Sequence, residues 1–475
     1  MSESMPAVAV LRGVGHLLRD YRMTHGLTQA DLGDRLGFDQ SYISKVESGR
    51  RHIRDLDALR RIAEVLAIAP EDLGLSRDDE LLNEARAVNH AAAAAVASSQ
   101  RQWRMTREHL NRSRVALGRE ATALYPGCSM DSMRGALLVR PDWLFAQPLD
   151  FERIALRWVD DAPPPLVTGS EPEAESVRPL SAADRRYHRY SRAIRDLDRP
   201  TLFESRASFR LIGMETSDPT APRMTFSHTT YFEMVDVCEA AAHELAAVHM
   251  AHRRVEWAAL PFRRLISDPF DLARRCVAPS INTLTIRRDG RGGSFILHDR
   301  SSAQVAVAGG MYHIMPAGMF QPSSVSPQGE ALDFDLWRNV MREYSEEFLG
   351  NPEHDGSEAR SIDYDAVEPF RSLNAARRAG KLRIACFGIG LDPLTLVGEI
   401  LSAVVIDADV FDDVFQALVP TNAEGTIVTT GGQAAAGIPF EDRNIRRLLT
   451  SESMAPAAAA CLDLAWRHRA ALLAA

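Results

Sequence analysis

Three glutamates lie close together in the segment REYSEEFLG, residues 342–350. Glu343, Glu346 and Glu347 are spaced i, i+3 and i+4, which places them on one face of a helix. Carboxylates crowded on one face repel one another unless a cation or an arginine compensates them. Mg²⁺ prefers such oxygen ligands and keeps waters that a diphosphate can replace. The segment is therefore a candidate Mg²⁺ site, and a solvent-facing glutamate-rich surface is the alternative.

A second group of candidate residues lies between positions 28 and 51. Thr28 precedes QADL, with Asp31 three positions on, a capping box that starts a helix. Gly37 ends that helix, and Asp39 is a suitable N-cap for the next one, QSYISKVES. Two short helices joined by a three-residue turn form a helix-turn-helix, whose second helix can enter the major groove of DNA.

The exposed positions of this module suit DNA. Residues on the second helix can reach base edges, and residues at the first helix's N-terminus or beyond the second helix can contact phosphates. The expected DNA-binding residues are Thr28, Gln29, Gln40, Ser41, Tyr42, Ser44, Lys45, Arg50 and Arg51. The expected apolar core of the module is Leu18, Ala30, Leu32, Leu36, Ile43 and Val46.

The stretch LTQADLGDRLGFDQSYISKVESGRR resembles the lambda-repressor/Xre-type helix-turn-helix family, over about residues 11–75. The resemblance implies a double-stranded DNA operator as partner and makes Arg22–Glu47 a structural pair. Because the net charge of the chain is −9, contact with DNA requires a local basic patch. Arg50, Arg51 and Arg54 supply it.

The composition describes a cytoplasmic protein of several domains. A chain of 475 residues exceeds one ordinary domain. The five cysteines are odd in number and form no CxxC pair, which fits a reducing compartment better than a disulfide framework. We find no signal peptide and no apolar run that would span a membrane, so no membrane partner is expected.

The expected fold class is multidomain, α plus α/β. Residues 8–76 form the all-helical head, and residues 78–275 form a helical middle region with a proline-rich loop near 160–180. After Pro279 the pattern changes to period two, with INTLTIRRDG and SFILHDRS flanking a hairpin turn. Residues 276–450 are thus an α/β domain, and residues 451–475 are a C-terminal helix.

The α/β domain resembles the Nudix hydrolase family over about residues 278–420. The resemblance rests on REYSEEFLG, the upstream hairpin, YHIMPAGMFQP, and the strands in FGIGLDPLT and AVVIDADVF. It implies a mixed sheet, Mg²⁺ held by Glu343, Glu346 and Glu347, and a nucleoside diphosphate substrate. The spacing from Gly318 to Glu330 is about twice the family's, and an insertion of about one helical turn separates Glu330 from Arg342. Position 344 is Tyr where the family has an aliphatic residue.

These departures favour one of two functions. Hydrolysis needs a precisely positioned substrate, and the lengthened loop should frame that substrate. We therefore expect a transcriptional regulator that acts as a homodimer and senses a small, nucleotide-like ligand without hydrolysing it. The alternative is a Mg²⁺-dependent hydrolase of nucleoside diphosphate derivatives with a DNA-binding head. Helices at 78–122 or 454–473 should form the dimer. His243 and His249 are six residues apart, so HELAAVH is not expected to bind zinc.

Overall fold

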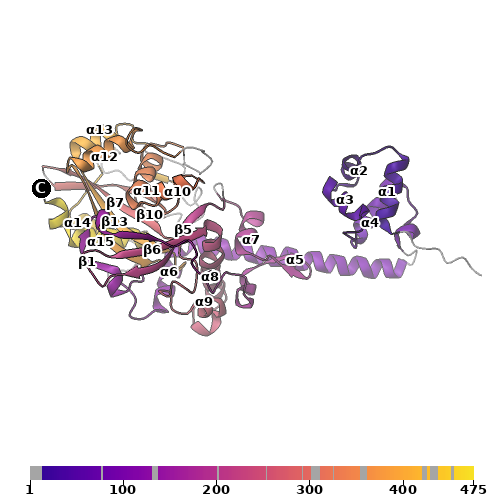
Figure 1. Ribbon diagram of the computed structural model, residues 1–475. Coiled ribbons are helices and arrows are strands. Elements are labelled where there is room, and N and C mark those ends of the chain that lie inside the picture. Colours follow the sequence, from indigo (N-terminus) through magenta and orange to yellow (C-terminus); the bar gives the residue numbers. More distant parts are fainter. Residues whose placement is uncertain are drawn as a thin grey trace, which may run out of the picture. The chain divides into compact units, whose positions relative to one another are not determined.

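The computed structural model describes residues 13–75, 79–130, 137–200, 203–252, 254–290, 292–300, 311–324, 326–352, 361–419, 425–427, 437–450 and 454–474. The chain divides into two compact units, Met1–Ala97 and Ser98–Ala475 (Figure 1). The helix α5 (Asp79–Arg112) runs across the boundary between them. The expected division at residue 275 does not occur, because residues on both sides of it share one hydrophobic core.

The first unit is a small helical bundle. Its helices are α1 (Val14–Thr24), α2 (Gln29–Leu36), α3 (Gln40–Glu47), α4 (Leu56–Leu66) and the 3₁₀ helix η1 (Pro70–Leu73). Leu18, Leu32, Leu36, Ile43 and Val46 are buried, as their helical spacing predicts. Ala30 is exposed, so its assignment to the core was wrong. It lies on the solvent side of α2, two positions before Leu32.

The second unit contains a mixed sheet. Its strands are β1 (Leu144–Leu149), β7 (Ser280–Asp289), β8 (Gly292–Phe295), β11 (Ala317–Met319), β12 (Leu382–Leu391), β13 (Gly398–Asp407) and β15 (Ile438–Pro439). Their order is β1-β12-β13-β7-β8-β15, with β11 also paired to β7. The central pair β13–β7 is parallel, and the other pairings are antiparallel. The predicted hairpin of β7 and β8 is confirmed, with Ile286 opposite Phe295.

Smaller sheets surround this one. They comprise β2 (Ala155–Trp158), β6 (Arg223–Thr230) and β5 (Ala207–Glu215); β10 (Met311–Ile314), β9 (Leu297–Arg300) and β14 (Gly425–Ile427); and β3 (Leu180–Ala182) with β4 (Arg185–Arg186).

Helices cover both faces of the large sheet. The remaining α-helices are α6 (Arg114–Ala123), α7 (Tyr190–Leu197), α8 (Tyr231–His252), α9 (Pro261–Ile266), α10 (Pro327–Asp333), α11 (Leu336–Glu343), α12 (Phe370–Arg378), α13 (Ala408–Val414), α14 (Asp442–Leu449), α15 (Pro456–Arg467) and α16 (Arg469–Leu473). Short helical segments are η2 (Pro141–Trp143), η3 (Phe151–Arg153), η4 (Pro172–Val177), η5 (Trp257–Ala259) and the π-helix η6 (Tyr344–Phe348).

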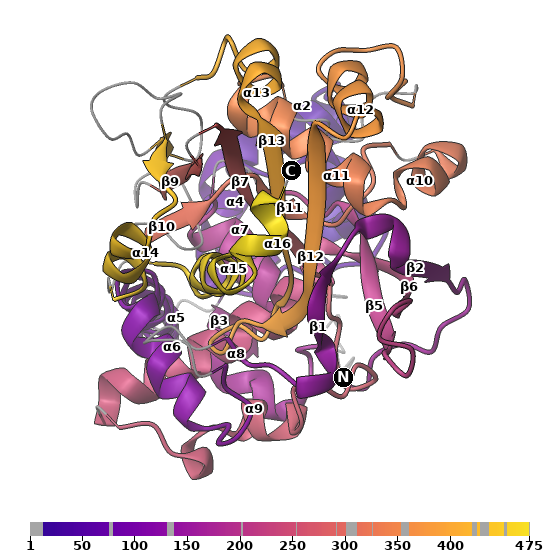
Figure 2. The same ribbon diagram turned by 90° about the vertical axis from the view of Figure 1, so that its left-hand side faces the viewer.

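The two faces of the sheet bury different side chains, because successive residues of a strand point to opposite faces. Leu284 and Leu401 share one core with α15, which lies across that face (Figure 2). Ile281 and Ile400 belong to the other core, which includes Val340 of α11 and Phe411 of α13.

The expectation of a helical middle region was wrong for residues 144–230. Strand β1 pairs with β12 at the edge of the large sheet, and β6 lies at the centre of a smaller one, between β2 and β5. Buried polar side chains conceal these strands in the sequence. Arg210 in β5 is only 5% exposed and donates a hydrogen bond to the carbonyl of Pro163. The proline-rich segment is also packed, since Val167, Ala174 and Val177 are buried.

Candidate functional site

Local capping interactions position the two helices of the helix-turn-helix. The Thr28 hydroxyl accepts a hydrogen bond from the Asp31 amide, and the Asp31 carboxylate accepts one from the Thr28 amide, which confirms the capping box. Asp39 accepts a 2.7 Å bond from the Tyr42 amide and caps α3. Gly37 ends α2 with φ of 74°, a conformation that glycine adopts without strain.

A close approach of α1 to α3 fixes the second helix further. A Cβ atom at Gly15 would lie 2.2 Å from the backbone oxygen of Val46. Because no side chain fits there, only glycine lets α1 pack this closely on α3. The recognition helix is thus held from its N-terminus by Asp39 and near its C-terminus by α1.

Residues of α3 that could contact DNA are accessible to solvent. Gln40, Ser41 and Lys45 are exposed, and Tyr42 and Ser44 are half-buried. The ring of Tyr42 stacks on Phe38, with ring centroids 4.6 Å apart. Side chains at the start of such a helix are the ones that meet base edges when it enters the major groove.

Two of the expected phosphate contacts are already held by the fold. The guanidinium of Arg51 lies 4.5 Å from the ring centroid of Tyr42, so this cation is placed beside α3. Gln29 donates a 2.9 Å hydrogen bond to Glu47, which ties the start of α2 to the end of α3. Thr28, Arg50 and Arg51 are exposed.

The pair Arg22–Glu47 is present, as the family resemblance implied. Arg22 Nε and one terminal nitrogen donate to the two carboxylate oxygens of Glu47 at 2.8 and 3.0 Å. Burial alone would raise the pKa of Glu47, but hydrogen bonds from Arg22 and Gln29 hold it below its usual value. The carboxylate therefore stays ionised and links three helices of the bundle.

The glutamates of REYSEEFLG do not form a fully solvent-facing surface, the alternative to a metal site, since Glu347 is buried and Glu343 and Glu346 are half-buried. Glu347 is 5% exposed and accepts a hydrogen bond from the Ala317 amide at 3.3 Å. Glu343 lies directly over Gly318, where a Cβ atom would fall 1.9 Å from its carboxylate oxygen. Both carboxylates turn towards β11 because α11 and η6 pack on this side of the sheet.

The lengthened segment between Gly318 and Arg342 contains two separate helices. Residues 327–333 form α10, and α11 begins anew with Asp335 as its cap. Glu330 consequently lies on another helix from Glu343, and it pairs with His228 instead. Tyr344 is fully buried, and its hydroxyl hydrogen-bonds Thr285 at 2.8 Å, which explains an aromatic residue at this position.

Arg342 is also a structural residue. Its guanidinium is buried and contacts Asp333 at 3.1 Å and the Tyr364 hydroxyl at 2.8 Å. Asp333 in turn accepts a hydrogen bond from the Ser323 amide at 2.8 Å. This network anchors the loop that follows β11 to α10 and α11.

The positions of the glutamates add no support to the expected metal site. Among the described residues, no three His, Cys, Asp or Glu side chains are arranged to hold a metal ion. The π-helical turn at Tyr344–Phe348 changes the i, i+4 register on which the expected set depended. A Mg²⁺ site at Glu343, Glu346 and Glu347 thus stays a prediction, without support from their positions.

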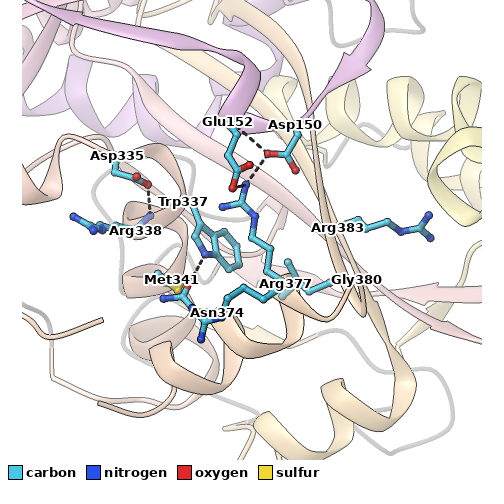
Figure 3. Close-up of a pocket in the computed structure, with 12 residues that line it drawn as sticks. Asp150, Glu152, Asp335, Trp337, Arg338, Met341, Asn374, Arg377, Gly380 and Arg383 are labelled. Atoms are coloured by element: carbon cyan, nitrogen blue, oxygen red, sulfur yellow. Dashed lines mark hydrogen bonds and ion pairs between the residues drawn. The ribbon is translucent and has the colours of Figure 1, made fainter. Parts of the chain in front are cut away.

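A pocket of about 500 Å³ lies beside α11 in the second unit (Figure 3). It is lined by Asp150, Glu152, Asp335, Trp337, Arg338, Met341, Asn374, Arg377, Arg378, Gly380, Leu382 and Arg383. At its centre, Arg377 contacts the carboxylates of Asp150 and Glu152 at 2.6 and 2.9 Å and lies 5.7 Å from the Trp337 ring centroid. The Arg383 side chain points away and donates to the Leu472 carbonyl.

This pocket was missed in the sequence because its residues are far apart along the chain. Asp150 and Arg377 are separated by 227 positions. Trp337 is 4% exposed, and its indole nitrogen donates to Asn374 at 2.9 Å. An aromatic wall with both signs of charge can hold a small polar molecule.

The two histidines of HELAAVH have separate surroundings. His243 is buried against Trp103 and hydrogen-bonds the Tyr190 hydroxyl at 3.0 Å. Burial lowers the pKa of His243 to about 3, so its ring is neutral. His249 instead contacts His109 of α5 at 3.0 Å. The two side chains do not converge on one site.

Comparison with known proteins agrees with the architecture of the first unit. Residues 14–74 match a protein family described as a helix-turn-helix domain. No curated protein matches the chain. None of the helices in the described part of the chain is long and apolar enough to cross a membrane.

Proposed function

We propose that this chain is a sequence-specific DNA-binding transcriptional regulator. The observation that supports this most is the helix-turn-helix at residues 14–74, with a rigidly capped α3 whose Gln40, Ser41 and Lys45 are exposed. Arg51, stacked on Tyr42, supplies a positive charge beside that helix. Together these provide base-reading and phosphate-binding groups on one module.

The experiment that tests this function is capture of genomic DNA. Fragmented DNA from the source organism is incubated with the tagged full-length chain at physiological salt, and the bound fragments are sequenced. A regulator enriches a small set of fragments that share a motif. Recovery of the input distribution, with no shared motif, would overturn sequence-specific binding. A variant with Gln40→Ala and Ser44→Ala serves as the matched control.

The second unit, in this proposal, senses a small molecule. The pocket at Trp337 and Arg377 supports this part, because an aromatic ring, an arginine and two carboxylates converge there. A nucleotide-like ligand suits such a site, since its phosphates can meet arginine. The resemblance to Nudix hydrolases is a further reason to expect a nucleotide.

Ligand binding is tested by thermal unfolding of the full-length chain with nucleoside diphosphates, dinucleotides and nucleotide sugars. A compound at 100 times its dissociation constant should stabilise the folded state by about 2.7 kcal/mol. The shift should vanish with Trp337→Ala and persist with Trp466→Ala, a matched change on α15. If no compound shifts the unfolding temperature, the nucleotide class is wrong for this pocket.

A further inference from the structure

Positive charge is concentrated in one stretch of the second unit. Residues 185–199 contain six arginines and two aspartates, a formal net charge of +4 from six minus two, with His188 neutral. The whole chain has a net charge of −9. The arginines are Arg185, Arg186, Arg189, Arg192, Arg195 and Arg199.

The structure holds most of these charges at the surface. The hairpin β3–β4 exposes Arg185 and Arg186, and α7 exposes Arg192. Helix α7 is anchored from beneath, since Tyr190, Ala193 and Ile194 are buried. The arginine-bearing side of this segment is therefore the side that faces solvent.

Helix α5 extends the same surface. Arg104 is exposed and donates a 3.0 Å hydrogen bond to the Leu197 carbonyl at the end of α7. Ser99 accepts one from the Leu180 amide in β3, and Figure 1 shows α7 lying beside α5. Tyr187 is near enough to Asp196, Arg192 and Arg104 for each to affect its pKa, which burial raises. We call Arg101, Arg104, Arg185, Arg186, Arg189 and Arg192 the arginine surface.

The acidic residues nearby do not cancel this charge. Asp196 pairs with Arg192 at 3.1 Å and with Arg195 at 3.5 Å, so one carboxylate serves two cations. Asp198 pairs with Arg107, which is itself buried. Arg186 and Arg189 donate hydrogen bonds to the carbonyls of Arg178 and Thr168, contacts with neutral groups that orient the two guanidinium groups.

We propose that the arginine surface binds the phosphate backbone of duplex DNA. The inference rests on the proposed function, because a chain whose helix-turn-helix binds an operator is tethered, as a whole, to the same DNA molecule. Guanidinium groups match phosphate geometry and remain charged at any physiological pH. Among the described residues of this stretch, no Phe, Tyr or Trp side chain is exposed for stacking unpaired bases, which favours a duplex over a single strand. Such contacts add affinity that depends on salt and not on sequence.

The test compares full-length variants on a random-sequence duplex of 40 base pairs, by fluorescence anisotropy at several salt concentrations. The surface variant carries Arg185→Gln, Arg186→Gln and Arg192→Gln. The matched control carries Arg443→Gln, Arg446→Gln and Arg447→Gln, three exposed arginines of α14 with the same change in net charge. A third variant replaces the same three surface arginines with lysine. Circular dichroism checks the folding of each.

We expect the glutamine variant to reduce the steepness with which the logarithm of the association constant falls with the logarithm of salt concentration, by about 2 to 3, since each phosphate contact contributes about 0.9. The control and the lysine variant should keep the wild-type slope. If the surface variant and the control have equal slopes, while Arg51→Ala still weakens binding of the wild-type chain, DNA binding by the arginine surface is overturned and the proposed function stands. Absence of any duplex binding by the wild type would overturn the proposed function as well.

Discussion

Arg22 and Glu47 form a two-pronged ion pair between α1 and the last residue of α3, with nitrogen–oxygen distances of 2.8 and 3.0 Å. The Glu47 side chain is 5% exposed and that of Arg22 is 16% exposed. The pair fixes α3 against the bundle, and Gln29 adds a third contact from α2. We propose that DNA binding by α3 depends on this pair through the position that it gives the helix.

Removal of Arg22 should destabilise the head. Arg22→Ala removes both guanidinium hydrogen bonds from the buried Glu47 carboxylate and leaves Gln29 as its remaining hydrogen-bond donor. An incompletely satisfied buried group costs about 1–3 kcal/mol. The lost free energy of unfolding is measured by chemical denaturation of the full-length chain, with hydrogen exchange of residues 14–66 as the signal for the head. His16→Ala, a change at an exposed position of the same helix that is not among the groups shifting the Glu47 pKa, is the control and should cost much less.

The same pair predicts how the head responds to acid. The folded-state pKa of Glu47 lies below its ordinary value of 4.5, so the carboxylate contributes stability above that pH. The contribution is lost as the pH falls through the folded-state pKa. Glu47→Gln should therefore make the free energy of unfolding of the head depend less on pH in the acid range. If this pH dependence is the same in Glu47→Gln and the wild type, another group controls it.

The Glu244 carboxyl group should give the second unit the opposite dependence of stability on pH. Its oxygens accept hydrogen bonds from the amides of Phe262 and Arg263 at 2.7 and 2.9 Å, but burial raises its pKa to about 7. A raised carboxyl pKa means that stability is fully present below pH 4.5 and declines as pH rises to about 7. The decline should reach up to about 3 kcal/mol, since one pKa unit corresponds to about 1.4 kcal/mol.

Urea unfolding of the second unit at pH 5 and pH 8 measures this decline. Glu244→Gln removes the ionisable group and should be less sensitive to pH over this range than the wild type. Glu256→Gln, at an exposed position, should behave as the wild type does. A wild-type stability that rises from pH 5 to pH 8, with no change in Glu244→Gln, would contradict the assignment.

The proposed homodimer should form through α5. The alternative helix, α15, buries Ala458, Cys461 and Leu462 within its own chain, so its apolar face is already covered. Several alanines of α5 between residues 91 and 97 are exposed. Light scattering at micromolar concentration should give twice the mass of the chain. Ala94→Glu keeps a good helix former but places charge on this surface, and it should reduce the dimer fraction.

The carboxylates of REYSEEFLG should not support metal-dependent hydrolysis. Glu347 is buried and accepts a hydrogen bond from the Ala317 amide, so it stabilises the packing of β11 against η6. We expect no phosphate release from dinucleotides or nucleotide sugars with Mg²⁺, and no effect of EDTA on DNA affinity. Turnover by the wild type that Glu346→Gln with Glu347→Gln abolishes would establish the hydrolase alternative instead.

The parts of the fold that the sequence predicts are those set by neighbouring residues. Thr28 and Asp31 cap one helix and Asp39 caps the next within three positions, so the helix-turn-helix was predictable in detail. The hairpin of β7 and β8 is equally local. Pro456 likewise marks the start of α15.

The remainder depends on contacts distant in sequence. Arg210 is a charged residue inside a buried strand, and its hydrogen bonds to the distant carbonyls of Pro163 and Leu272 make that position tolerable. The pocket exists because the loop after β1 brings Asp150 to Arg377. The surroundings of Glu347 likewise follow from β11 packing on η6. No local pattern encodes these relationships.

The most direct test of the account is the affinity of Gln40→Ala for a DNA fragment enriched by genomic capture, measured beside a random duplex of equal length. Gln40 is exposed at the first position of α3, where a base contact is expected, and losing such a contact costs about 1–3 kcal/mol. Affinity for the captured fragment should fall accordingly while affinity for the random duplex stays constant. Arg51→Ala should weaken both and reduce the salt dependence of binding. Unchanged affinity of Gln40→Ala for the captured fragment would contradict the placement of α3 as the recognition helix.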